Sequence, residues 1–145
     1  MPETIDRISL TVIENPAPQD LEDVDEGLRA HNFAATGDRG HRSFAVKAFD
    51  DRGALAGGAI ASVHWGWCYL AVLWVRPDRR GAGLGSRLLA EVERQTLAGG
   101  IHNLYLDTYS FQALPFYLKH GYTVFGQLED YPPPHTKHFL RKKLE

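Results

Sequence analysis

Two shortages in the 145-residue sequence exclude whole classes of protein: it has little cysteine and no long unbroken apolar run. The single cysteine, Cys68, permits neither an internal disulfide nor a paired-cysteine metal motif, which fits a reducing compartment. Glycines and His64 interrupt the most apolar stretch, residues 53–75, so we interpret it as buried strands rather than a membrane span. The first residues show no basic segment followed by an apolar one, so we expect a cytoplasmic protein without a membrane partner.

An excess of charge of either sign is also missing. The formal net charge is −2, so no global field attracts nucleic acid, and we expect no such partner. His135 and His138 stand three positions apart, a spacing that cannot place both rings on one face of a strand, so we expect no metal site. The composition, 43% hydrophobic and 23% charged, is that of a globular protein, and the length suggests a single domain over residues 1–145.

The spacing of apolar residues predicts an α+β protein. Short turns join three strands into an antiparallel meander, whereas the strand–helix–strand order that follows implies a right-handed parallel crossover. Strands are expected at residues 8–14, 43–51, 54–65, 67–75, 101–107, 122–128 and 137–144. Helices are expected at residues 19–33, 83–98 and 111–120.

The stretch "RRGAGLGSRLL" at residues 79–89 is the strongest local signal. It stands between a strand and a helix, where free N–H groups and the helix dipole form an anion site and glycines leave room for a phosphate. A nucleoside triphosphate loop is excluded because no lysine lies between Lys47 and Lys119. A dinucleotide fingerprint is a closer fit, with Asp107 as its acidic residue, but Ser86 replaces its third glycine and "RPDRR" separates strand from loop.

A third pattern fits the loop better. Residues 80–85, "RGAGLG", match R/Q-x-x-G-x-G/A and follow the lead-in "LWVRPDRR". A second pattern, Asn-x-x-Ala-x-x-x-Tyr-x-x-x-Gly-Phe/Tyr, appears at residues 110–122 as "SFQALPFYLKHGY", with Ser110 in the asparagine position. Together, over about residues 40–130, these motifs resemble the GNAT superfamily of N-acetyltransferases. The tail "LEDYPPPHTKHFLRKKL" is similar to a bacterial subgroup of that superfamily.

The resemblance implies a fold and a co-substrate. The fold would be a layered α/β/α protein whose mixed, mostly antiparallel sheet has about six to seven strands and about four flanking helices. Acetyl-CoA would place its pantetheine arm along the backbone of residues 73–75, where the Leu73 N–H would donate a hydrogen bond to the oxyanion. Its pyrophosphate would lie on the glycine loop, the glycine-rich part of residues 79–89. The implied contacts are Leu73, Trp74, Val75, Arg80, Gly81, Ala82, Gly83, Leu84, Gly85, Ser86, Ser110 and Phe116.

The resemblance also implies direct attack of an amine on the thioester, without an acyl-enzyme. Tyr117 would be the general acid that protonates the departing thiolate. Many relatives carry a carboxylate base on the third meander strand, but "WCYLAVLWV" has none. Candidates for the base are Asp107, Tyr69, His64 or an ordered water, and Asp107 is equally suited to capping the turn "DTYS".

Three functions stay open at this point. The first is acetyl transfer from acetyl-CoA to a primary amine, on a small molecule or a peptide. The second is a non-catalytic acyl-CoA-binding or regulatory module, and the third is a dinucleotide-binding domain. The sequence marks neither the acceptor nor the interface of a possible homodimer, and Trp65, Trp67 and Trp74 are expected mostly in the core or at sheet edges, with a substrate-facing role for one left open.

Overall fold

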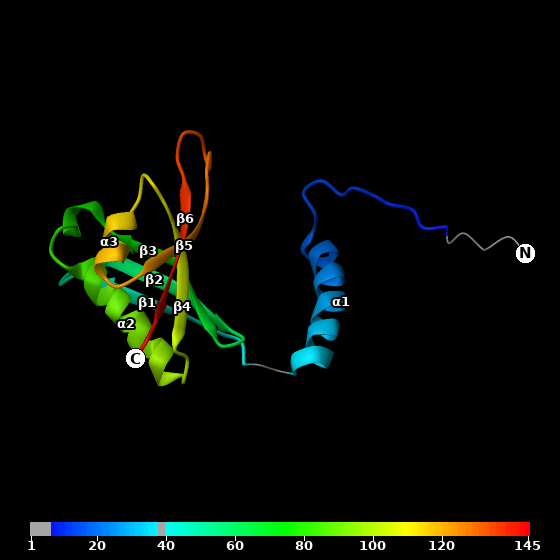
Figure 1. Cartoon of the computed structure of the whole chain (residues 1–145), viewed down its shortest axis with the longest axis horizontal. Coiled ribbons are helices and arrows are strands. Elements are labelled where there is room, and N and C mark those ends of the chain that lie inside the picture. Colours follow the sequence, from blue (N-terminus) through cyan, green and yellow to red (C-terminus); the bar gives the residue numbers. More distant parts are fainter. Residues whose placement is uncertain (1–6, 38–39) are drawn as a thin grey trace, which may run out of the picture. The chain divides into compact units, whose positions relative to one another are not determined.

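A computed structural model of the chain describes residues 7–37 and 40–145. The residues group into two units that divide between residues 38 and 39. The described part of the first unit contains one helix, α1 (Pro18–Thr36), and the second unit contains all the strands (Figure 1). A single domain over residues 1–145 stays a prediction.

Local chemistry explains why helix α1 begins and ends where it does. Pro18 occupies the first turn, where its missing N–H costs nothing, and the Asp20 carboxylate accepts a hydrogen bond of 2.8 Å from the Ala17 N–H. Gly37, at a φ of 68°, ends the helix. The strand expected over residues 8–14 is wrong, because no strand in the described sheet pairs with that segment and an unpaired strand has no ladder.

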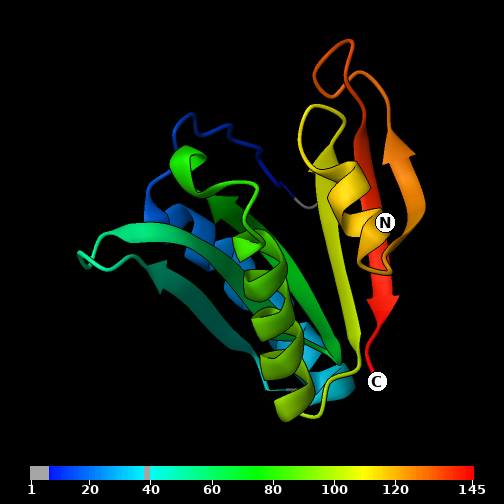
Figure 2. The ribbon, with the colours of Figure 1, turned by 90° about the vertical axis from the view of Figure 1, so that its left-hand side faces the viewer.

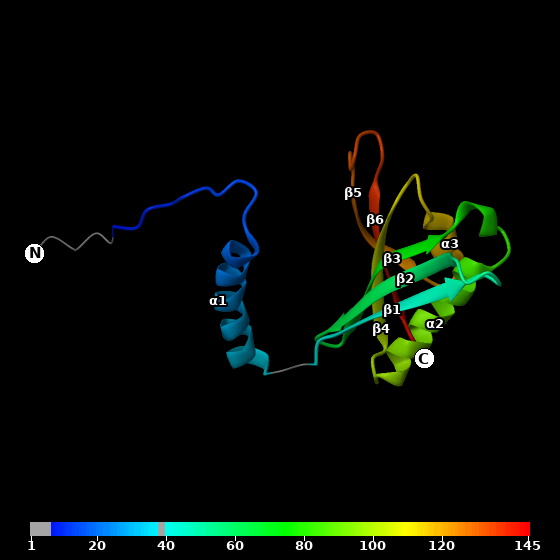
Figure 3. The ribbon, with the colours of Figure 1, turned by 180° about the vertical axis from the view of Figure 1, so that it is seen from behind.

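The second unit is built on a six-stranded sheet with the order β1-β2-β3-β4-β6-β5 (Figures 1 and 3). The strands are β1 (Arg42–Phe49), β2 (Leu55–His64), β3 (Trp67–Val75), β4 (Asn103–Tyr109), β5 (Thr123–Leu128) and β6 (Lys137–Lys143). Only β3 and β4 pair in parallel, and the other neighbours are antiparallel. This confirms the meander, the crossover and the mixed α+β fold, and it rules out the doubly wound parallel sheet of a dinucleotide-binding domain.

Two α-helices, α2 (Leu84–Ala98) and α3 (Leu114–Lys119), lie on one face of this sheet (Figure 2). Leu89 and Val92 of α2 and Tyr117 of α3 pack with the inward residues of the strands in one core, which also holds Cys68. A short 3₁₀ turn, η1 (Pro77–Arg79), links β3 to the glycine loop. The described residues thus form three α-helices rather than about four, and none of them has the length and hydrophobicity that a bilayer crossing needs.

The segment between β4 and α3 differs from the sequence expectation in a way that matters for the site. Strand β4 continues past Asp107 to Tyr109, and α3 starts three residues later than expected. A turn separates them, in which the Gln112 side-chain oxygen accepts the Tyr109 N–H at 3.1 Å and the Thr108 hydroxyl accepts the Ala113 N–H at 3.3 Å. These side-chain hydrogen bonds hold residues 109–113 in a turn, where the sequence predicted the first turn of the helix.

Candidate active site

The parallel pair β3–β4 separates halfway along its length. The two strands pair only from Trp67 and Asn103 to Leu70 and Leu106, and they then diverge (Figure 2). A cavity of about 600 Å³ lies between them. It is lined by Leu70, Ala71, Val72, Leu73, Trp74, Val75, Arg80, Asp107, Thr108, Phe111, Gln112, Ala113 and Tyr117. Since the β3–β4 ladder stops at Leu70, the rest of that edge of β3 is open to a peptide-like ligand that adds as a strand does.

The glycine loop lies at one end of this opening. Gly81 and Gly83 have φ angles of 80° and 85°, which L side chains rarely adopt. Gly83 is also the N-cap of α2, so the first N–H groups of that helix have no partner within it and form an anion site together with the helix dipole. Arg80 fixes the loop to the strand, because its Nε donates a hydrogen bond of 2.9 Å to the Val75 carbonyl.

A second cavity, of about 460 Å³, joins the loop to the first one. Five residues line both cavities, namely Leu73, Val75, Arg80, Ala113 and Tyr117. The second cavity adds Arg79, Gly81, Gly83, Leu84, Gly85, Ser86, Phe116 and Lys119. An elongated ligand can therefore place an anionic end on the loop and its other end between the strands.

Tyr117 lies where the two cavities meet. Tyr117 is only 6% exposed, and its ring packs in the core beside those of Tyr122 and Phe116. Burial, with a smaller contribution from the negative charge of Asp107, raises the pKa of Tyr117 to about 12. The phenol is therefore protonated at neutral pH and has a proton to donate in the cleft.

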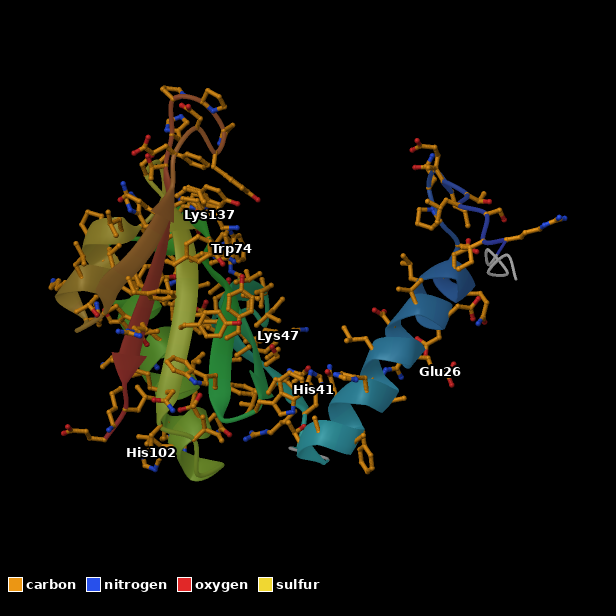
Figure 4. All side chains as sticks on the ribbon, turned by 45° about the vertical axis from the view of Figure 1, so that its right-hand side comes forward. Glu26, His41, Lys47, Trp74, His102 and Lys137 are labelled. Carbon is orange, nitrogen blue, oxygen red and sulfur yellow. The ribbon has the colours of Figure 1, made fainter. Side chains whose placement is uncertain are left out.

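Asp107 lines the first cavity together with Tyr117. The Tyr69 hydroxyl donates a hydrogen bond of 2.6 Å to its Oδ2, and Lys137 Nζ lies 3.8 Å from its Oδ1. Lys137, labelled in Figure 4, opens β6 and pairs with Tyr109 at the end of β4. Because Asp107 lies within the paired part of β4, the interpretation that it caps a turn is wrong, and its residue lines the wall of the cavity.

The other side chains considered as a base are less well placed. Burial, followed by the hydrogen bond to Asp107, raises the pKa of Tyr69, so this phenol keeps its proton. His64 stacks on Trp65 at a ring distance of 4.0 Å and lines a different cavity. Of the three side chains, Asp107 alone lines the cavity with Tyr117 and accepts rather than donates the nearest hydrogen bond.

Two residues that the resemblance assigned to the co-substrate do not line either cavity. Ala82 faces a separate hollow of about 540 Å³ between β1 and α2. The Ser110 hydroxyl accepts the Thr136 N–H at 3.1 Å and lies 3.3 Å from His135 Nδ1, so it is engaged with the loop before β6. Their contacts to acetyl-CoA stay predictions.

Sequence reasoning missed one contact that joins the loop to α3. His120 Nδ1 lies 2.7 Å from the Phe116 carbonyl, which can only accept, so this nitrogen carries the proton. In the neutral imidazole, its Nε2, 2.9 Å from Ser86 Oγ, accepts the serine hydroxyl proton. The His120 imidazole thus links α3, the helix that carries Tyr117, to the start of α2. No motif in the sequence predicted this contact.

Sequence reasoning also missed how closely β2 approaches the cleft strand. A Cβ on Gly57 would lie 2.7 Å from the Trp74 carbonyl oxygen, which no side chain can tolerate without a backbone shift. The small residues in "ALAGGAIA" were the available signal, because glycine inside a strand often marks close approach of another backbone.

The chain is similar to known acetyltransferases in sequence and in fold. The family model "Acetyltransferase (GNAT) family" matches residues 8–122. The blasticidin-S acetyltransferase of Streptomyces morookaense is 43% identical over 102 residues, covering 70% of this chain and 75% of that protein. The crystal structure of an acetyltransferase from Bacillus cereus matches with a TM-score of 0.84 at 31% identity, over 92% of this chain and 98% of that one. A Bacillus anthracis structure named for streptothricin acetylation and solved with acetyl coenzyme A shares the fold alone, with a TM-score of 0.64 at 18% identity over 71% of this chain and 63% of that one.

Proposed function

Because the chain belongs to the GNAT family of acetyltransferases and is an acyltransferase, we propose that it transfers the acetyl group of acetyl-CoA to a primary amine in the cleft between β3 and β4. The observation that carries this proposal is that Asp107 and Tyr117 both line one cavity, which leads to the glycine loop. The two side chains supply a proton acceptor and a proton donor.

The proposed contacts to the co-substrate are supported by the fit of the cleft. The N–H groups at the start of α2 and the loop glycines suit a pyrophosphate, and Arg80 adds positive charge at the same place. The open edge of β3 suits the two amides of a pantetheine arm, and the Leu73 N–H is the proposed donor to the thioester oxygen. Phe116 and Val75 line the passage between these two ends.

The proposed chemistry uses direct attack in a ternary complex. Asp107 accepts a proton from the amine as its nitrogen forms a bond to the carbonyl carbon of the thioester. The Leu73 N–H stabilises the negative charge on the oxygen, and the carbon–sulfur bond then breaks. Tyr117 donates its proton to the departing thiolate, so the products are an amide and a free thiol.

The two other functions considered are supported less well. A non-catalytic acyl-CoA-binding module was favoured by the missing carboxylate on β3, but Asp107 of β4 supplies a carboxylate in the same cavity. A dinucleotide domain conflicts with the antiparallel sheet and with the family assignment. Acetyl transfer accounts for both the glycine loop and the cleft.

The name of one relative suggests a first acceptor to try. That relative is a blasticidin-S acetyltransferase, and the 43% identity extends over 70% of this chain. We therefore place blasticidin S in a panel with an aliphatic diamine, an aminoglycoside and a peptide with a free N-terminus. A peptide acceptor and a small-molecule acceptor are both compatible with an open cleft.

The experiment measures release of thiol from acetyl-CoA by the purified full chain, with each amine and without amine. The proposal predicts amine-dependent thiol release and an equal amount of acetylated amine by mass spectrometry. Tight binding of acetyl-CoA without thiol release for any amine would support the non-catalytic module instead. Tighter binding of NAD than of CoA by calorimetry would support the dinucleotide domain.

A further inference from the structure

A separate hollow lies at the start of β3, away from the glycine loop. It has a volume of about 410 Å³, within the range of small-molecule sites. It is lined by His41, Ser62, His64, Trp65, Trp67, Tyr69 and Tyr105. None of these residues is a lysine, arginine, aspartate or glutamate, so aromatic and imidazole rings dominate its walls.

Strand register explains why the rings gather at this place. Tyr69 is paired with Ser62 of β2 and with Tyr105 of β4, and Trp67 is paired with His64. Paired residues project from the same face of a sheet, and residues two positions apart on one strand do so as well. Cys68, between Trp67 and Tyr69, is fully buried on the face that packs against α2. The rings therefore lie on the opposite face of the sheet.

The rings form walls rather than a packed core. Tyr69 and Tyr105 stack with their centroids 4.9 Å apart, and Trp67 meets Tyr105 edge-on at 6.0 Å. On the other side, His64 stacks on Trp65. Trp65 is 43% exposed and Trp67 is 37% exposed, so neither is buried in the core, the first of the two positions expected for the tryptophans. Large exposed rings that converge on one hollow mark a binding surface.

The hollow is connected to the proposed catalytic base through Tyr69. The ring of Tyr69 lines the hollow, and its hydroxyl donates the 2.6 Å hydrogen bond to Asp107. Tyr105 and Asp107 are two positions apart on β4, which places them on the same face and about 7 Å apart along the strand. A group bound among the rings therefore lies one short linker away from an amine at Asp107.

We propose that this hollow binds a planar aromatic group of the acceptor, carried on a linker of about two to four bonds from the reacting amine. This inference rests on the proposed acetyl transfer and narrows its acceptor class to arylalkylamines and similar heteroaromatic amines. The faces of Trp67 and Tyr69 supply stacking surfaces for a flat ring. The Ser62 hydroxyl and the imidazole of His41, labelled in Figure 4, supply polar partners for the edge of a heterocycle.

The test compares two amines that differ only in the aromaticity of their ring, 2-phenylethylamine and 2-cyclohexylethylamine. Their KM values for acetylation are measured at saturating acetyl-CoA, and their Kd values are measured separately by quenching of tryptophan fluorescence, with and without CoA. We expect the phenyl compound to bind about fivefold more tightly, since stacking adds to simple burial. The Trp67→Leu variant is expected to lose that preference, and so is His64→Ala. Phe125→Leu, which changes an exposed ring on β5 outside the hollow, is the control that keeps it.

The readouts separate this inference from the proposed function. Equal KM and Kd values for the two amines in the wild-type chain overturn the aromatic site while leaving acetyl transfer intact. A preference that survives in both Trp67→Leu and His64→Ala overturns it as well. Binding of the phenyl compound that depends on Trp67, without acetylation of this amine or of any amine in the panel, supports the site and contradicts the proposed function.

Discussion

At the scale of single residues, the environment of each ionisable group decides its role in the cleft. Tyr117 and Asp107 line the same cavity, where burial keeps the proton on the phenol and the Asp107 carboxylate accepts a hydrogen bond from the Tyr69 hydroxyl. The pair therefore suits a reaction that removes one proton and supplies another. The resemblance that "SFQALPFYLKHGY" carries implied the role of Tyr117. The sequence could not decide whether Asp107 faces the cleft or caps a turn, because the extent of β4 was not known.

The role of Tyr117 predicts a specific kinetic result for Tyr117→Phe. Loss of the phenolic proton is expected to lower kcat by about 100-fold, because the thiolate leaves without a general acid, while the Kd of acetyl-CoA stays within about twofold. Steady-state kinetics and calorimetry measure the two quantities.

Tyr122→Phe is the matched control for this variant. Tyr122 is buried like Tyr117, but its hydroxyl lies 3.3 Å from Glu93 and it lines neither of the two cleft cavities. Its kcat is expected to stay near that of the wild type. A Tyr117→Phe enzyme with unchanged kcat at every pH would remove Tyr117 from the acid role.

At the scale of elements, the cleft exists because β3 has two different neighbours. Against β2 it is paired along nearly its whole length, with one irregularity opposite Ile60 and Ala61, and against β4 it is paired only up to Leu70. The divergence of β3 and β4 after Leu70 leaves one edge of β3 open, and this edge leads to the glycine loop. Sequence periodicity predicted the meander and the crossover, but it could not predict where the ladder stops, since pairing length depends on twist and on contacts between distant segments.

The loop geometry predicts that Gly83→Ala weakens acetyl-CoA binding. Alanine at a φ of 85° costs about 1–2 kcal/mol, so the loop is expected to shift. The first N–H groups of α2 would then no longer point at the proposed phosphate site. We expect the Kd of acetyl-CoA to rise at least tenfold, as measured by calorimetry.

Gly53→Ala separates a loss of binding from a loss of stability. Gly53 has a similar φ of 78° in the turn between β1 and β2, away from both cleft cavities. Its melting temperature is expected to fall as that of Gly83→Ala does, with no change in Kd. Equal Kd values for the two variants would show that the loop does not hold the phosphate.

At the scale of the whole molecule, the family and the mixed fold followed from the two motifs and the order of elements. Two features did not follow. The segment 8–14 has the alternating composition of a strand but finds no partner in the described sheet, and pairing cannot be derived from one strand alone. The partial exposure of Trp65 and Trp67 did not follow either, because the sequence left core and sheet-edge positions open, and burial depends on what covers both faces of the sheet.

Acid stability is expected to depend on Asp50, in the turn that joins β1 to β2. Hydrogen bonds from the N–H groups of Ala54 and Arg52, then the Arg76 guanidinium, hold the pKa of Asp50 below its usual 3.8. A carboxylate with a lowered pKa in the folded state stabilises the protein above about pH 4, and this stabilisation is lost as the pH falls through the folded value.

The corresponding variant is Asp50→Asn. Its melting temperature is expected to lie below that of the wild type at pH 7, with the gap closing below about pH 4. Asp51→Asn, an exposed change in the same turn, is the control and is expected to melt as the wild type does. A gap that stays constant from pH 7 to pH 3 would contradict the role of the Asp50 charge.

The most direct test of the central claim is the acceptor kcat/KM of Asp107→Asn at saturating acetyl-CoA, with the acetyl-CoA Kd measured on the same sample. Asparagine keeps the shape of the side chain and a hydrogen bond to Tyr69 but cannot accept the amine proton. We predict that kcat/KM falls by about 100-fold or more while the Kd is unchanged. A kcat/KM within about threefold of the wild type would contradict the assignment of Asp107 as the base of this cleft.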